Sequence, residues 1–384
     1  MRHWGRREMI RLGAGAVAGC GATALVGACH GEAHPATSAP SPAPTATPAA
    51  LACGAADLGP PARVAAVRGR DLGAMTRDAL DAIGGIASVV HEGETVFVKP
   101  NMVTLPWASA TYNPFRLGEC TKPEIVIAVV EECLRVGARE VIVGDGSQMP
   151  RFDWSGAVTL DGGTNLAREA SRLDARYPGK VRLACLDVDT AAWVDVPTGT
   201  SLGHVAVSSL VTGVDRVISI PVAKTHKWAY LTLSLKNFIG ITPLERYGWA
   251  NSGNHDRVLL HRNDSSPLGF GRLFVDLAHA AQPDLALIDF SIGMEGDGPS
   301  TSSGGIPLDV ATRLGSWLVL ASTDAVAADA TAARIMGQES PYVGEILRMA
   351  HEAGMGAICT ESIDLVGARL DELRLEWRRA QVAT

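Results

Sequence analysis

The stretch that decides the fold lies between Thr95 and Gly146 and contains TVFVKPN at 95–101, PEIVIAVVEECLRVG at 123–137 and EVIVGDG at 140–146. Two short apolar runs flank a segment with helical spacing, which begins at Pro123 and is followed by Gly137. Proline in the first turn and glycine just past the last turn are typical of a helix. A strand, helix, strand unit requires parallel pairing and a right-handed crossover, so we predict an α/β protein.

The same alternation continues on both sides of this unit. Short runs of Val, Ile and Leu predict strands at 63–67, 181–188, 204–208, 215–222, 285–289 and 317–320. Helical spacing predicts helices at 75–90, 165–177, 270–281, 324–336 and 343–353. Continuous apolar strands separated by helix-length segments are typical of a mostly parallel sheet with helices on both faces, here in a single large domain.

The composition limits the kinds of function that we expect of this chain. The chain has 384 residues, of which 47% are hydrophobic and 20% charged, so it is long and apolar enough to bury a large core. The formal net charge is −7, and no basic block stands out. Binding to phosphate backbones needs clustered Lys and Arg, so we expect no nucleic-acid partner.

The first 61 residues predict an export signal followed by a tether to the membrane. Residues 1–28 combine Arg6-Arg7 with a short, uncharged Gly- and Ala-rich run, which is typical of a twin-arginine export signal. The box ending at Cys29 resembles a lipoprotein cleavage site, so we expect a lipidated Cys29 to attach the chain to a membrane. Residues 29–61 are rich in Pro, Ala, Ser and Thr and predict an extended spacer before a domain at 62–384. The protein is therefore expected outside the cytoplasmic membrane, in the periplasm or at the cell surface, after passing the twin-arginine export machinery.

Four predicted strands are followed by a polar residue, namely Lys99, Asp145, Lys224 and Asp289. In open α/β sheets ligands bind outside the carboxyl ends of the strands. We therefore expect these four residues to converge on one cleft.

Six motifs occur in the same order over about 240 residues. They are Val98-Lys99-Pro100-Asn101, Gly144-Asp145-Gly146, Lys224-Thr225-His226, Leu235-Lys236-Asn237-Phe238-Ile239-Gly240, Met294-Glu295-Gly296-Asp297-Gly298-Pro299 and 321–329. Together they resemble domain of unknown function family 362, a bacterial and archaeal family. The resemblance implies a shared fold and site more than a particular reaction. Many members carry an appended ferredoxin-like module with iron–sulfur clusters, and this chain has no such cysteine run.

The residue types suit an anionic ligand. Lysines supply compact positive charge and asparagines directional hydrogen bonds, and a histidine exchanges protons near neutral pH. We expect a small anion to be bound by five residues: Lys99, Asn101, Asp145, Lys236 and Asn237. The candidate catalytic residues are Lys224, His226 and Glu295. Residues 228–238 fit both a strand, which groups Thr232 with Lys236, and a helix, which groups Tyr230 with Asn237.

A divalent metal is the one cofactor that these residues suggest, with His226, Asp289 and Glu295 as ligands. The glycine patterns that bind a nicotinamide dinucleotide or the phosphates of ATP do not occur in the sequence, and neither do cysteine spacings for a built-in iron–sulfur cluster. We expect most of the cysteines to be structural, because Cys133 and Cys185 fall in apolar elements.

Three functions stay open at this level. The first is an exported enzyme that uses acid–base or metal-assisted chemistry on a small anionic substrate. The second is a lipoprotein that binds a metal or a small anion without changing it. The third, which follows only from the resemblance, is a redox protein that works with an external iron–sulfur partner.

Overall fold

The structure is a computed structural model that describes residues 61–199, 202–248, 257, 260 and 267–381. Residues 1–60, with the predicted export signal, Cys29 and nearly all of the predicted tether, lie outside the described residues. The first strand, β1, begins at Ala62. In the described part of the chain, no helix has the length and apolar character needed to cross a membrane.

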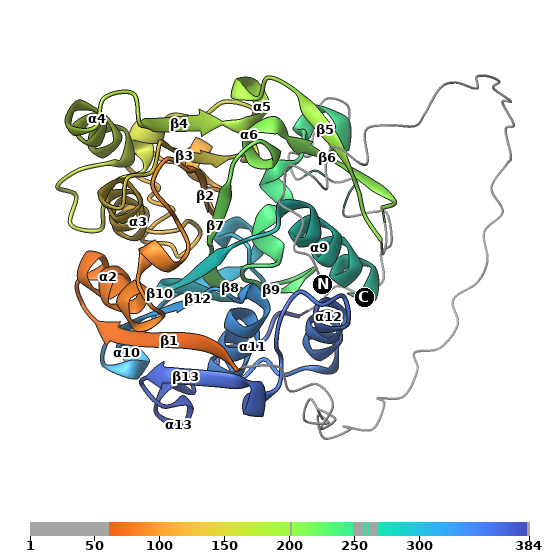
Figure 1. The fold of residues 1–384 in the computed structure, drawn as a ribbon. Helices are drawn as coiled ribbons and strands as arrows, with labels where there is room; N and C mark the ends of the chain where they lie inside the picture. The colour runs from red at the N-terminus through yellow and green to blue at the C-terminus, as the bar shows by residue number, and fades with distance from the viewer. Residues whose placement is uncertain (1–60, 200–201, 249–256, 258–259, 261–266, 382–384) are drawn as a thin grey trace, which may run out of the picture.

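The core is an 11-stranded sheet whose main path runs β13-β1-β12-β10-β7-β2-β3-β4, with β8, β9 and β11 attached beside β10 (Figure 1). Its strands are β1 Ala62–Gly69, β2 Thr95–Pro100, β3 Glu140–Asp145, β4 Val181–Cys185, β7 Arg216–Ile220, β8 Val222–His226, β9 Tyr230–Thr232, β10 Leu285–Gly296, β11 Gly305–Asp309, β12 Trp317–Ser322 and β13 Ile363–Gly367. A separate two-stranded ribbon contains β5 Trp193–Pro197 and β6 His204–Ser208.

The helices connect and cover these strands. The α-helices are α2 Leu72–Ala82, α3 Pro123–Arg135, α4 Leu166–Arg176, α5 Leu186–Asp189, α6 Ser209–Thr212, α7 Leu244–Tyr247, α9 Pro267–Ala281, α10 Ala311–Leu314, α11 Ala325–Ile335, α12 Pro341–Glu352 and α13 Leu370–Leu373. The 3₁₀ helices are η1 Ile86–Ser88, η2 Leu105–Trp107, η3 Trp154–Gly156, η4 Lys236–Ile241, η5 Thr301–Ser303 and η6 Thr360–Ser362.

The sheet is mixed but mostly parallel, as the sequence predicted. Strands β10, β7, β2, β3 and β4 run parallel to one another, and β12 runs antiparallel to both β1 and β10. The carboxyl ends of β2 and β3 therefore meet at one edge, with Val98 opposite Val143. Lys99 and Asp145, which follow these positions, lie at that edge.

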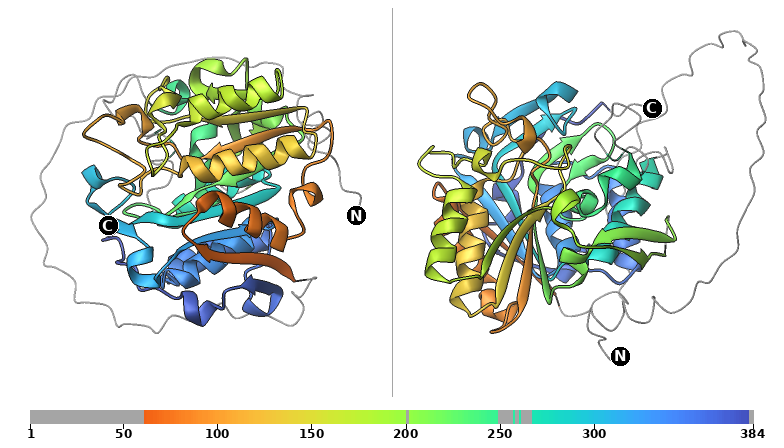
Figure 2. Two further views of the ribbon diagram at one scale, coloured as in Figure 1. Left: turned by 90° about the vertical axis from the view of Figure 1, so that its left-hand side faces the viewer. Right: turned by 90° about the horizontal axis from the view of Figure 1, so that it is seen from above.

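Both faces of the sheet are covered, because fully buried strands send alternate side chains to opposite sides. Val96 and Val98 of β2 pack in one apolar core with α2, α3 and α4. Phe97 between them packs in a second core with α9, α11 and α12 (Figures 1 and 2). This confirms the predicted fold class.

Two of the local predictions that bear on the site differ from the structure. The strand predicted to stop at Asp289 continues to Gly296, because β11 and β8 pair with its second half. Residues 228–238 form neither one strand nor one helix: β9 ends at Thr232, and Lys236 begins the 3₁₀ helix η4. Tyr230, which follows the turn between β8 and β9, has a φ of 62°, a backbone conformation that non-glycine residues seldom adopt.

Candidate anion-binding pocket

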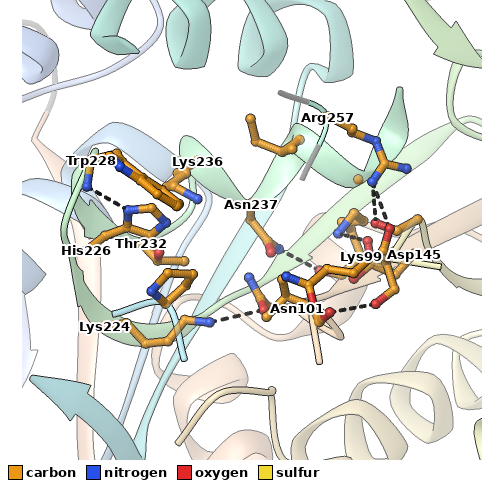
Figure 3. Close-up of a pocket in the computed structure, with 17 residues that line it drawn as sticks. Lys99, Asn101, Asp145, Lys224, His226, Trp228, Thr232, Lys236, Asn237 and Arg257 are labelled. Carbon is orange, nitrogen blue, oxygen red and sulfur yellow. Dashed lines mark hydrogen bonds and ion pairs between the residues drawn. The ribbon is translucent and has the colours of Figure 1, made fainter. Parts of the chain in front are cut away.

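A pocket lies at the carboxyl ends of β2 and β3, beside the hairpin of β8 and β9 (Figure 3). Its volume is about 610 Å³, including open solvent at its mouth. Lys224, His226 and Thr232 line one side, Lys99, Asp145 and Arg257 line the opposite side, and Asn101 and Asn237 lie between them. The structure thus brings together seven of the predicted site residues: Lys99, Asn101, Asp145, Lys224, His226, Lys236 and Asn237.

Lys99 and Asp145 form a buried ion pair, with 2.5 Å between Lys99 Nζ and Asp145 Oδ1. The second carboxylate oxygen of Asp145 accepts the backbone N–H of Met102 at 2.7 Å, which ties the ends of β2 and β3 together. Burial lowers the pKa of Lys99 below its ordinary value, although the Asp145 carboxylate opposes this shift. The charge of Lys99 is therefore largely compensated within the protein.

The contacts of Lys224 differ from those of Lys99. Its Nζ donates to the Glu119 carbonyl at 2.6 Å and to Asn101 Oδ1 at 3.3 Å, and both of these are neutral oxygens. The residue is completely buried, and no carboxylate of the described chain lies within ion-pair distance of it. Burial lowers the pKa of Lys224 to about 8. Its ammonium is a buried charge at the pocket wall, and no residue in the described part of the chain forms an ion pair with it.

The backbone holds His226 in one tautomer. Its Nδ1 accepts the backbone N–H groups of Trp228 at 3.2 Å and Ala229 at 3.3 Å. Since both partners are donors, Nδ1 carries no proton, and the neutral ring has its proton on Nε2. His226 therefore lines the pocket as an Nε2–H donor.

Asp329 supports the segment that carries Lys236 and Asn237. Its carboxylate accepts the backbone N–H groups of Ser234 at 2.8 Å and Leu235 at 2.9 Å, just before η4 begins. Burial raises the pKa of Asp329 to about 7. This residue lies in the last of the six motifs but outside the pocket, and it acts by positioning η4. Asp324, in the same motif, caps α11 by accepting the Ala327 N–H at 2.8 Å.

Arg257 is a pocket residue that sequence reasoning missed. Its guanidinium pairs with Asp187 at 2.9 Å and donates to the carbonyls of Ser147 at 2.9 Å and Thr242 at 2.8 Å. It is 3% exposed. No periodicity or motif in the sequence marks it, because its partners come from segments that are far away along the chain.

Sequence reasoning also missed Glu119, whose contacts hold part of the pocket wall in place. It is fully buried, its Oε1 accepts the Thr301 backbone N–H at 2.7 Å, and its Oε2 accepts the Tyr112 hydroxyl. These contacts hold in place the backbone carbonyl that receives Lys224. Its only sequence signal is its place four residues before the proline that opens α3.

Asp289 is not part of the pocket, which corrects its prediction as a ligand residue. It lies in the middle of β10, fully buried, and forms an ion pair with Lys122 at 3.3 Å. It also accepts the Lys122 backbone N–H at 3.0 Å, at the start of α3. Because the strand predicted to end at Asp289 continues, the Asp289 side chain lies in the protein interior and not at a strand end.

Glu295 is likewise outside the pocket lining. Both of its carboxylate oxygens accept hydrogen bonds from Arg313, at 2.9 and 2.8 Å, and one also accepts the Arg378 backbone N–H. Burial by itself raises the pKa of Glu295, but these donors outweigh it and leave the pKa below its ordinary value. Among the described residues no cluster of three His, Cys, Asp or Glu side chains has a metal-binding arrangement, so His226, Asp289 and Glu295 do not form the predicted metal site.

The comparison with protein families gives one match. Residues 96–334 match the family described as Domain of unknown function (DUF362). This range covers all six motifs and includes every lining residue named above.

Similar proteins were found by sequence and by structure. The chain is 27% identical over 230 residues to the Thylakoid-associated protein sll1697 of Synechocystis sp. (strain ATCC 27184 / PCC 6803 / Kazusa), a match that covers 59% of this chain and 60% of the relative. The lactate racemase apoprotein from Thermoanaerobacterium thermosaccharolyticum aligns with a TM-score of 0.32 at 12% identity, over 61% of this chain and 51% of that one. A structural-genomics protein from Thermotoga maritima aligns with a TM-score of 0.35 at 12% identity, over 73% and 58%. The chain thus matches well under two thirds of the length of each of these proteins.

Proposed function

Because the chain belongs to the DUF362 family, and because four cationic side chains and one carboxylate line its pocket, we propose that it binds a small anion there and exchanges a proton with it. The anion is a carboxylate or a phosphate ester. The protein would then be an acid–base enzyme that acts on a small anionic substrate.

The observation that carries this proposal is the environment of Lys224. Burying a charge is costly unless it is paired, and among the described residues the hydrogen-bond partners of Lys224 are two neutral oxygens. Two other cations of the pocket lining, Lys99 and Arg257, are compensated by Asp145 and Asp187. An anion beside Lys224 supplies the missing counter-charge.

One residue has the properties needed to move a proton, and a second one orients the anion. A pKa of about 8 lets the Lys224 amine lose or take up a proton near neutral pH. His226 presents Nε2–H and is oriented by two backbone donors, so it donates a hydrogen bond to the anion. We assign Lys224 as the acid–base residue and His226 as the hydrogen-bond donor that orients the anion.

Binding can be tested without knowing the substrate. Isothermal titration with inorganic phosphate and acetate should detect binding to the wild type and at least a roughly tenfold weaker affinity in Lys224→Met, because a charge-assisted contact is lost. Lys227→Met is the matched control, since Lys227 neighbours the same strand but does not line the pocket. Equal affinity of the wild type and Lys224→Met would contradict the proposal.

Turnover separates an enzyme from a binder. Incubation of the wild type in D₂O with a panel of small carboxylates and phosphate esters, followed by NMR, reports either conversion or deuterium uptake. We expect His226→Gln to lose about 100-fold in rate while retaining most of its affinity. Binding of the same compounds without any conversion by the wild type would overturn the catalytic part and leave a binding protein.

We also propose that this pocket works outside the cytoplasmic membrane, on a spacer attached through Cys29. The twin-arginine pattern and the lipoprotein-like box support this location. Cys359 forms a disulfide, and disulfides persist mainly in oxidising compartments, which supports it as well.

A further inference from the structure

The amide of Asn237 has only one orientation that fits its surroundings. Its Nδ2 donates to the Lys99 carbonyl at 2.8 Å and to Ser219 Oγ at 3.1 Å. Rotating the amide by half a turn would place Oδ1 against the Lys99 carbonyl oxygen, so the assignment of the two amide atoms is fixed by the partners. Oδ1 is therefore the atom that is left for another contact.

Two acceptor atoms in the pocket wall have no partner in the described chain. Asn237 Oδ1 and Thr232 Oγ1 are both buried and receive no hydrogen bond from any described residue. Asn237 is 3% exposed and Thr232 is 1% exposed, and both line the pocket. A buried polar atom without a partner costs on the order of 1 to 3 kcal/mol, so such atoms are usually satisfied when a site is occupied.

These atoms lie beside the lysine that would bind the anion. In the β8–β9 pairing Thr232 is directly opposite Lys224, and residues opposite each other on neighbouring strands have their side chains on the same face. Asn101, which accepts from Lys224, lies between Lys224 and the Lys99 side of the pocket, and Asn237 is next to it (Figure 3). A ligand held by Lys224 therefore has these two oxygens within its immediate surroundings.

An ionised carboxylate or a fully ionised phosphate ester offers only acceptor oxygens, and these would face Asn237 Oδ1 without a hydrogen between them. We infer that the ligand carries a hydroxyl group next to its anionic group, and that Asn237 Oδ1 accepts from this hydroxyl while Thr232 Oγ1 contacts the same polar end. The inference rests on the proposed anion binding at Lys224. An ammonium group would also donate, but it would lie among Lys224, Lys99 and Lys236, and repulsion between like charges disfavours it.

Matched compounds test this inference on the wild-type protein. Propionate, glycerate and alanine share a three-carbon skeleton and differ in their donors, and propyl phosphate with glycerol 3-phosphate forms the corresponding phosphate pair. We expect glycerate to bind at least roughly tenfold more tightly than propionate, and glycerol 3-phosphate more tightly than propyl phosphate, in titration calorimetry.

Thr232→Val is the variant of choice because it breaks no hydrogen bond within the described structure and keeps the side-chain shape. It should reduce the preference for glycerate over propionate to within about threefold, while Thr232→Ser should retain the preference. Ser234→Ala is the control, since it removes a hydroxyl two residues away that does not line the pocket.

The outcomes distinguish the two proposals. Equal affinities for propionate and glycerate, both dependent on Lys224, would overturn the hydroxyl inference and leave anion binding intact. Tighter binding of alanine than of glycerate would also overturn it, in favour of an ammonium donor. If none of the five compounds binds, both proposals are contradicted.

Discussion

The residue that distinguishes this pocket is Lys224, and its behaviour follows from burial and not from residue type. Lys99, Lys122 and Lys224 are all fully buried lysines at or near the same sheet edge. Lys99 and Lys122 each have a carboxylate partner, whereas none of the residues that the structure describes supplies one to Lys224. Their neighbours along the chain do not reveal this difference, because the partners come from other strands.

The pKa of Lys224 predicts a pH dependence of stability. The unfolded chain releases the Lys proton near pH 10.4, whereas the folded protein releases it near pH 8. Between these values the unfolded state binds more protons, so the free energy of unfolding rises with pH, and below about pH 8 this gain is absent. We expect the wild type to gain on the order of 1 to 2 kcal/mol relative to Lys224→Met between pH 8 and pH 10, measured by urea unfolding. If the free energies of unfolding of the two proteins change with pH in the same way, the lowered pKa of Lys224 is contradicted.

At the level of elements, the pocket depends on how closely η4 approaches the end of β3. A Cβ placed on Gly240 would lie 2.2 Å from Asp145 Oδ1 and 2.5 Å from the Gly146 carbonyl oxygen. No side chain fits there, so the glycine of the Leu235–Gly240 motif is explained by packing. The contact also keeps Asp145 in place for Lys99.

Gly240→Ala tests this contact. The added methyl group must displace either η4 or the Asp145 side chain, so we expect a loss of about 1 to 3 kcal/mol in the free energy of unfolding and weaker anion binding. Gly199→Ala is the control, because a Cβ at this exposed position meets nothing within 4 Å. Thermal denaturation and phosphate titration of both variants give the result, and a Gly240→Ala protein indistinguishable from Gly199→Ala would show that the contact is dispensable.

At the scale of the whole molecule, the pocket combines segments that are remote in sequence. Lys224 reaches Asn101 over 123 positions, and Asn237 reaches Lys99 over 138. The sheet brings them to one edge because β2 and β3, joined through α3, run parallel, and β7 continues directly into β8. The attachment of this domain depends on a segment outside the described residues, and it is a separate prediction.

Expression of the full chain in a bacterium with twin-arginine export tests that attachment. We expect the wild type to be found in the membrane fraction and to incorporate labelled palmitate, and Cys29→Ser to lose the label. Cys20→Ser is the matched control, because this cysteine precedes the predicted cleavage site. Label retained by Cys29→Ser, or absent from the wild type, would contradict lipidation at Cys29.

The sequence by itself determined the fold class and indicated seven of the residues that line the pocket. Apolar runs and helix punctuation carry local information, and a polar residue directly after a buried parallel strand reaches the ligand edge whatever the details of packing, as Lys99 and Asp145 do. Only the tertiary structure decided where β10 ends, because the length of this strand depends on its pairing with β8 and β11. The longer strand places Asp289 and Glu295 outside the site. The tertiary structure also decided which lysine lacks a carboxylate partner and which amide oxygen faces the pocket, because both depend on contacts between segments distant in the chain.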